Sequence, residues 1–259
     1  MRIIFEALKI DKMPKTKLVH LWFLSLFGLA SLAYITMPRN GALDLFQTQL
    51  SAFLQREGYL PFPPPAWFSM LWRQAGLFVV SLWFILLYAV HWLFASSEMT
   101  GQVIGEDDSI VIPPLQVTPD RSPSMTALRA FPALLLLAAT MLVPYILSLP
   151  AMGIPFYALT TMLSMTIFIV IFEGKSLPSA MEGSYKMTSG MKFFIFASFL
   201  FLRSLTTIAG DLLRSLFSES LWAGSLIRAF FFALNTLAYG RLAGMFYRSL
   251  SVRRALDGH

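Results

Sequence analysis

The sequence predicts an all-α, polytopic helical membrane protein, and its composition and hydropathy are the observations behind this fold class. Charged residues make up only 13% of the 259 residues and hydrophobic residues 56%, whereas an ordinary soluble domain has about 25% charged residues. The mean hydropathy is +0.65. So little charge cannot cover a water-exposed surface of this size. We therefore expect a single integral membrane domain over residues 1–259.

Six windows are apolar over about the 20 residues that a helix needs to cross the hydrocarbon core. They lie at residues 18–37, 75–95, 130–149, 154–172, 193–210 and 221–246. The connections between these windows are too short for a separate soluble domain. The sequence thus predicts six transmembrane helices, with short amphipathic helices at the membrane interface.

The positions of the basic residues predict the orientation. If the N-terminus is cytoplasmic, 14 of the 20 Lys and Arg residues fall on the inner side and 6 on the outer side. Basic connections resist translocation, so both termini are predicted to face the cytoplasm. Alternatively, the first window is a signal peptide that ends in the triplet Ser31-Leu32-Ala33. Its removal would leave five spans and a weaker charge asymmetry.

The N-terminal stretch can form a short helix in the headgroup layer. Met1, Phe5 and Leu8 share one helical face, and the charged residues lie on another. A frayed basic tail is the alternative.

An amphipathic helix is expected directly after the first span. Its apolar residues follow helical spacing, with Asn40 as N-cap and Gly58 as stop; they are Leu43, Phe46, Leu50, Phe53 and Leu54. The proline-rich segment 61–65 is expected to be extended. Trp67 and Trp72 are expected to form an aromatic belt at the mouth of the second span.

Two later connections have distinct compositions. The connection 96–126 contains the run Glu106-Asp107-Asp108, which could hold a divalent cation but is expected to be solvated. The third and fourth spans are joined by residues 150–153 alone. Prolines at 132, 144, 150 and 155 predict a kinked hairpin that is buried against other helices.

The segment 173–190 leads into the fifth span. Ser179 and Glu182 are spaced as a capping box, and Glu182 and Lys186 as an i,i+4 ion pair. We expect a short helix in the membrane plane that stops at Gly190.

Residues 184–190 (SYKMTSG), following Glu173-Gly174, resemble a junction found in YciC-like bacterial inner-membrane proteins. The resemblance extends to the layout of six spans. A looser resemblance links the sequence to the membrane domain of bacterial glycerophosphodiester phosphodiesterases. Those enzymes carry out their chemistry in a separate soluble domain, which has no counterpart in these residues. The resemblance therefore implies a multi-pass protein of the bacterial cytoplasmic membrane and no catalysis.

No catalytic residue, cofactor or metal site is predicted. Cysteine is absent and only His20, His91 and His259 supply imidazole, which excludes thiolate chemistry and histidine-rich metal sites. His91 is expected to lie at the interface. Glycine-rich phosphate loops do not occur.

The net charge of +6 is concentrated at span ends, which indicates anionic lipid headgroups as partners rather than nucleic acid.

Two groups of intramembrane residues are candidates for special roles. Arg203, Asp211 and Arg228 are predicted to form a polar cluster in the outer leaflet, since an unpaired arginine at that depth is costly. Either Asp211 and lipid phosphate tether the two arginines and the cluster has no further role, or the cluster binds an anionic headgroup or solute. A second group, Thr236, Gly240 and Gly244, shares one helical face and predicts close helix packing, within the chain or between copies.

The function predicted from these features is that of a non-enzymatic scaffold or accessory subunit. It would act through contacts with lipid, another membrane protein or a second copy of itself. The alternative is a small transporter or channel subunit with an anion or lipid-headgroup site. Its polar path would use the arginines of the fifth and sixth spans and four residues of the fourth span, namely Thr160, Thr161, Ser164 and Thr166. A lipid-acting enzyme is the third possibility.

Overall fold

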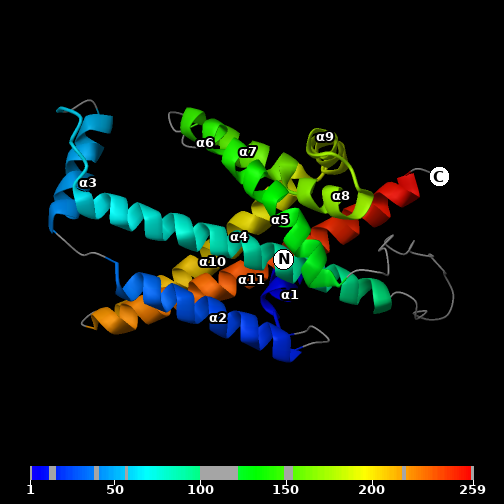
Figure 1. The fold of residues 1–259 in the computed structure, drawn as a ribbon, viewed down its shortest axis with the longest axis horizontal. Helices are drawn as coiled ribbons and strands as arrows, with labels where there is room; N and C mark the ends of the chain where they lie inside the picture. Colours follow the sequence, from blue (N-terminus) through cyan, green and yellow to red (C-terminus); the bar gives the residue numbers. More distant parts are fainter. Residues whose placement is uncertain are drawn as a thin grey trace.

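The computed structural model is all-helical (Figure 1). It describes residues 2–11, 16–37, 41–55, 58–99, 122–148, 154–217 and 220–257, which contain no strand. The helices within these ranges are α1 (Arg2–Leu8), α2 (Thr16–Ile35), α3 (Gly41–Leu54), α4 (Pro65–Met99), α5 (Pro123–Thr140), α6 (Leu142–Ser148), α7 (Ile154–Leu163), α8 (Thr166–Glu173), α9 (Leu177–Met187), α10 (Lys192–Leu216) and α11 (Leu221–Asp257).

Five helical segments of this fold are long and apolar enough to cross a membrane. They are Thr16–Ile35, Pro65–Ser96, Pro123–Ser148, Phe156–Glu173 and Lys192–Leu216. The predicted fold class is confirmed as an all-α protein with several helices of the length and composition that a membrane crossing requires. The sixth window forms the first part of α11, whose 37 residues include Arg228, Arg241 and Arg248.

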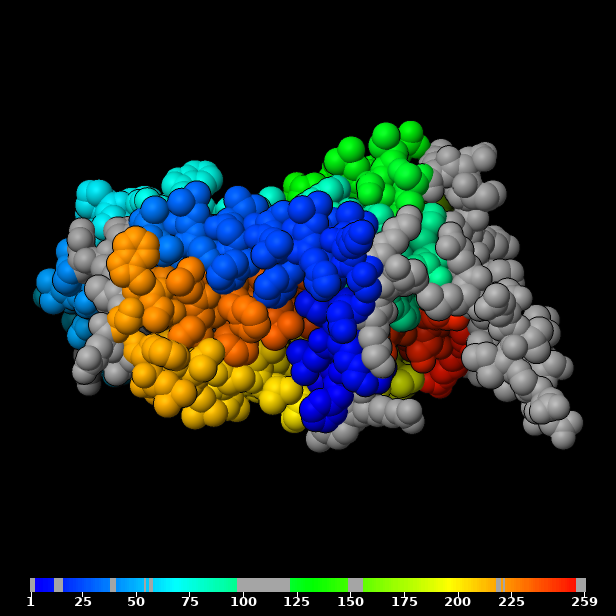
Figure 2. Space-filling view, turned by 90° about the horizontal axis from the view of Figure 1, so that it is seen from below, coloured from blue at the N-terminus to red at the C-terminus, as the bar shows by residue number. Residues whose placement is uncertain are grey.

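Helix α11 lies at the centre of the bundle, with α2, α4 and α10 running alongside it (Figures 1 and 2). The core is formed where these helices meet. Leu237, Leu242 and Phe246 of α11 are buried with Leu26 of α2 and Tyr88 of α4. The last helix in the sequence therefore holds the first helices together.

Glycines on α11 allow its backbone to approach α4. A Cβ atom on Gly240 would lie 2.7 Å from the carbonyl oxygen of Ile85, and one on Gly244 would lie 2.9 Å from Cε3 of Trp92. Thr236, the third residue of the face singled out in the sequence, is also buried. In this structure the face is used within the chain.

Helix α1 crosses α10 and α11 near the middle of the bundle (Figure 2). It buries Ile4 and Ala7, while Phe5 is 54% exposed. Leu8, which belongs to the predicted apolar face, also packs against the core, whereas Phe5 of that face points outward. The helix lies on protein, so the residues that meet α11 decide which side is buried.

Helix α3 lies where the sequence predicts a helix after the first span. Leu43 and Phe46 are buried, and the Phe46 ring lies 5.9 Å from that of Trp67 on α4. Trp67 thus packs on protein, whereas Trp72 is 75% exposed. The predicted N-cap Asn40 lies outside the described residues. Gly58 follows the helix with a φ of +102°.

The hairpin formed by the third and fourth spans lies at the edge of the bundle (Figure 1). The expectation of burial is wrong for the third span, because only 11% of the apolar window in Pro123–Ser148 is buried, whereas the window in Phe156–Glu173 is 33% buried. Several large apolar side chains point outward, namely Leu136, Leu142, Val143, Ile146 and Leu147. The break at Met141 follows from Pro144, which has no N–H to donate to the carbonyl of Thr140. Residues 149–153 and the acidic run 106–108 lie outside the described part of the chain.

Candidate functional site

A break in the fourth span fixes the position of α9. Helices α7 and α8 are interrupted at Ser164 and Met165. The buried Ser184 of α9 donates from its Oγ to the carbonyl of Met162 at 2.7 Å and accepts from the N–H of Met165 at 3.2 Å. One hydroxyl therefore satisfies two backbone groups at the break, and it anchors α9 against the span.

The ends of α9 differ in part from the prediction. Ser176, not Ser179, precedes the first helical residue, and Pro178 lies in the first turn. The predicted Ser179–Glu182 capping box is therefore wrong, because proline favours the start of a helix and moves the start upstream. The predicted pair is confirmed, with Glu182 Oε1 lying 2.6 Å from Lys186 Nζ.

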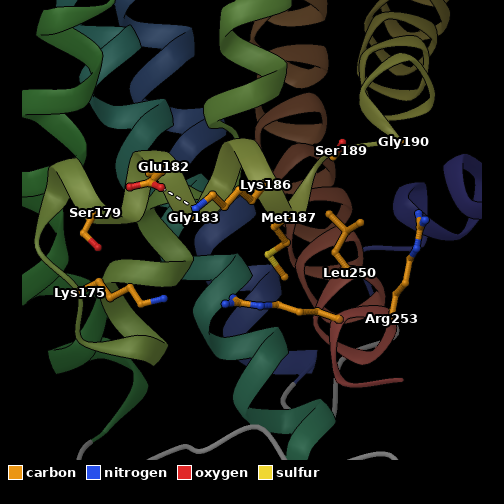
Figure 3. Close-up of a pocket in the computed structure, with 11 residues that line it drawn as sticks. Lys175, Ser179, Glu182, Gly183, Lys186, Met187, Ser189, Gly190, Leu250 and Arg253 are labelled. Carbon is orange, nitrogen blue, oxygen red and sulfur yellow. Dashed lines mark hydrogen bonds and ion pairs between the residues drawn. The ribbon is translucent and has the colours of Figure 1, made fainter. Parts of the chain in front are cut away.

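A cavity of about 580 Å³ lies between α9 and the C-terminal part of α11 (Figure 3). Four of the side chains lining it are basic, and we call it the basic cavity. Its lining residues are Lys175, Ser179, Glu182, Gly183, Lys186, Met187, Ser189, Gly190, Leu250, Arg253 and Arg254. Lys175 and Lys186 come from the α9 side and Arg253 and Arg254 from α11, so the cavity exists only when the two elements meet.

Two carboxylates pair with cations of the basic cavity. Glu182 pairs with Lys186, and the hydrogen bond from this ammonium holds the pKa of the Glu182 carboxyl below its usual range. Glu173 lies beside the cavity, 2.6 Å from Lys175 Nζ and 3.2 Å from Arg254 Nη1. Four cations and two carboxylates leave a net charge of +2.

Gly190 forms one wall of the basic cavity. Its φ of +79° belongs to the left-handed region that glycine adopts freely, and a Cβ atom there would lie 3.7 Å from Arg253 Nη2. The turn at Gly190 thus carries the chain from α9 into α10 beside the guanidinium of α11, where the sequence predicts the helix stop.

A second, smaller cavity of about 220 Å³ lies between α2, α10 and the N-terminal part of α11. We call it the Asp211 cavity. Its lining residues are Tyr34, Thr206, Thr207, Gly210, Asp211, Arg214, Ile227, Arg228, Phe231, Phe232 and Asn235. Two residues of the predicted polar cluster of Arg203, Asp211 and Arg228 belong to this lining.

The structure brings two members of that cluster together and leaves one apart. Asp211 and Arg228 line the Asp211 cavity, whereas Arg203 is exposed on α10 and is not among the lining residues. Asp211 Oδ1 lies 3.5 Å from Nη1 of Arg214, one turn away. The acid is thus paired first with its neighbour on the same helix.

Arg241 and His91 are buried, although both were expected at the membrane surface. Arg241, counted among the basic residues of the cytoplasmic side, is 6% exposed; its Nη2 lies 3.9 Å from Glu6 Oε2, and its Nε and Nη1 have no hydrogen-bond partner among the described residues. His91, expected at the interface, is buried with its Nε2 2.9 Å from Ser124 Oγ. Each links two helices, Arg241 linking α11 to α1 and His91 linking α4 to α5.

The polar residues of the fourth span mostly bond to their own helix. Thr160 and Thr161 donate to the carbonyls of Phe156 and Tyr157, and Ser164 donates to that of Thr161. These hydroxyls are therefore engaged in local hydrogen bonds.

Comparison with protein-family models, curated proteins and solved structures found no match for this chain. Among the described residues, no group of three or more His, Asp or Glu side chains is placed to hold a metal ion.

Proposed function

We propose that this chain is a six-span, YciC-like protein of the bacterial cytoplasmic membrane that acts as a non-enzymatic scaffold or accessory subunit. The outward apolar surface of the third span, formed by α5 and α6, is the observation that carries this proposal. Leu142, Ile146 and Leu147 are 58%, 61% and 75% exposed. Side chains of this kind fit lipid or the helix of a partner.

The directions of the packed helices support six spans. Contacts between α4 and α11 advance together along both helices, from Ile85 and Gly240 to Trp92 and Gly244, so the two helices run parallel. Parallel spans cross the membrane in the same direction, which requires an odd number of crossings between them. The three candidate spans formed by α5–α6, α7–α8 and α10 meet this requirement.

The first span is consistent with the same topology. Trp22 of α2 lies 4.9 Å from the ring of His91, and Ala30 clusters with Leu77. The contacts move in opposite directions along α2 and α4, so these helices are antiparallel. With α2 leaving the cytoplasm, α4 and α11 return to it, and both termini are cytoplasmic.

Site-specific photocrosslinking in living cells tests the accessory role. A photoreactive amino acid at Ile146 should give one discrete protein adduct, either with another membrane protein or with a second copy. The same group at Leu24, which is 63% exposed on α2, is the control for random encounters in the membrane. If residue 146 gives only lipid adducts, or the same protein adducts as residue 24, the accessory role fails.

A small transporter or channel subunit is the second candidate, and the Asp211 cavity favours it. Arg228 and Asp211 line a cavity between spans, as expected for an anion site in a membrane protein. The test is anion flux into liposomes that contain the purified protein alone. Flux that Arg228→Gln abolishes would support this function, and flux equal to that of empty liposomes would exclude it.

A further inference from the structure

We propose that the basic cavity binds the phosphates of an anionic phospholipid whose headgroup carries two negative charges. The proposal rests on the membrane topology proposed above for the position of the cavity at the cytoplasmic surface. It does not depend on the accessory role.

The charges of the cavity fit phosphate. Lys175, Lys186, Arg253 and Arg254 line it, and with Glu173 and Glu182 the group has a net charge of +2. Charged donors form the strongest hydrogen bonds to phosphate oxygens, and arginine does so with two N–H groups at once. A headgroup with two negative charges would neutralise the cavity.

The cavity is preformed by contacts that do not involve a ligand. Glu173 holds Lys175 and Arg254. The Ser184 hydroxyl fixes α9 against the fourth span. Binding therefore needs little ordering of the protein, which is the usual cost of holding long side chains around an anion.

The dimensions of the cavity favour a headgroup over a single small anion. A volume of about 580 Å³ falls in the range of sites that enclose small organic molecules, roughly 300–1,000 Å³. Ser179 and Ser189 add hydroxyls to the lining.

The surroundings favour a lipid over a soluble phosphate compound. Two candidate spans border α9, since Glu173 ends one and Lys192 begins the next. The cavity therefore lies where the helices leave the hydrocarbon. On the first turn of α10, Phe193 is 81% and Phe194 42% exposed. These rings offer acyl chains an apolar surface next to the phosphate site.

Native mass spectrometry of the full chain in a non-ionic detergent tests the proposal. Titration with diphosphatidylglycerol, which has two phosphates, should give a saturable complex, and phosphatidylcholine should not compete for it. The double variant Lys186→Gln/Arg253→Gln should bind at least about tenfold more weakly, because one lost charge-assisted hydrogen bond is worth about a factor of ten.

A matched control separates this site from general attraction to anionic lipid. Lys17 and Arg129 are exposed near the cytoplasmic ends of α2 and α5, so Lys17→Gln/Arg129→Gln removes the same charge outside the cavity. Its affinity should equal that of the unmodified protein. An equal loss in both double variants would overturn the proposal.

A second variant keeps every charge in place. Ser179 is exposed at the rim, and Ser179→Trp should fill part of the cavity and weaken binding without affecting folding. Unchanged affinity in this variant would contradict the proposed site.

Inorganic phosphate that displaces diphosphatidylglycerol at equal concentration would show that the cavity takes a soluble anion and would overturn the lipid assignment. Crosslinking at Ile146 is independent of all these results, so the two proposals can fail separately.

Discussion

Gly240 of α11 faces the carbonyl oxygen of Ile85 on α4 so closely that a Cβ atom would lie 2.7 Å from it. The atom that blocks a larger residue belongs to a helix backbone, which cannot move aside as a side chain can. The contact lies at the centre of the bundle, where α11 also packs on α2.

Gly240→Ala should therefore destabilise the protein by about 1–3 kcal/mol, the usual cost of overpacking a core. The shift in the thermal unfolding midpoint in detergent measures this change. Gly76→Ala on α4 is the control, since a Cβ there meets nothing within 4 Å and alanine is the better helix former. Equal stability of the two variants would contradict the close contact.

Ser184→Ala should cost about 1–3 kcal/mol, because it leaves the N–H of Met165 and the carbonyl of Met162 buried without a partner. The measurement is again the unfolding midpoint. Ser204, exposed on α10, provides the control substitution Ser204→Ala. A stability loss confined to Ser184→Ala would establish that the hydroxyl holds the break in the fourth span.

Single cysteines introduced into this cysteine-free chain should report the topology. An impermeant maleimide added to intact cells should label Thr48→Cys but neither Ile3→Cys nor Leu256→Cys. Permeabilised cells provide the control for reactivity. Labelling at residue 3 or 256 in intact cells, or protection of residue 48, would refute six spans with cytoplasmic termini.

Glu182→Gln should strengthen binding of diphosphatidylglycerol, because it removes a carboxylate that competes for Lys186. The same reasoning gives a pH dependence. The pKa of Glu182 is lowered by Lys186, so the carboxyl stays charged through neutral and mildly acidic pH. The affinity for diphosphatidylglycerol should therefore be constant at neutral and mildly acidic pH. It should rise only when the pH falls below the range in which glutamate usually titrates. In Glu182→Gln that part of the rise should be absent.

The helices could be predicted from the sequence better than their buried faces. Apolar windows and the spacing of Leu43 and Phe46 indicated the spans and α3. A membrane helix, however, is apolar on all sides, so composition does not tell the buried Leu26 of α2 from Leu24, which is 63% exposed. For the same reason the outward-facing surface of the third span could not be predicted.

The basic cavity could not be predicted because its parts are distant in the sequence. Lys175 and Arg254 both reach Glu173, although 81 residues separate Glu173 from Arg254. Sequence spacing revealed only the local pair of Glu182 and Lys186. In the Asp211 cavity, local spacing was likewise the better guide, since Asp211 pairs with Arg214 on its own helix.

Helices α4 and α11 contain 35 and 37 residues, which correspond to lengths of about 52 and 55 Å at 1.5 Å per residue. The hydrocarbon core is only about 30 Å thick. The packed pair is therefore longer than the hydrocarbon core is thick by more than about 20 Å. In the proposed orientation the turns of α11 that carry Arg253 and Arg254 lie in the headgroup layer on the cytoplasmic side. A soluble protein in the cytoplasm could therefore touch this part of the molecule without entering the membrane.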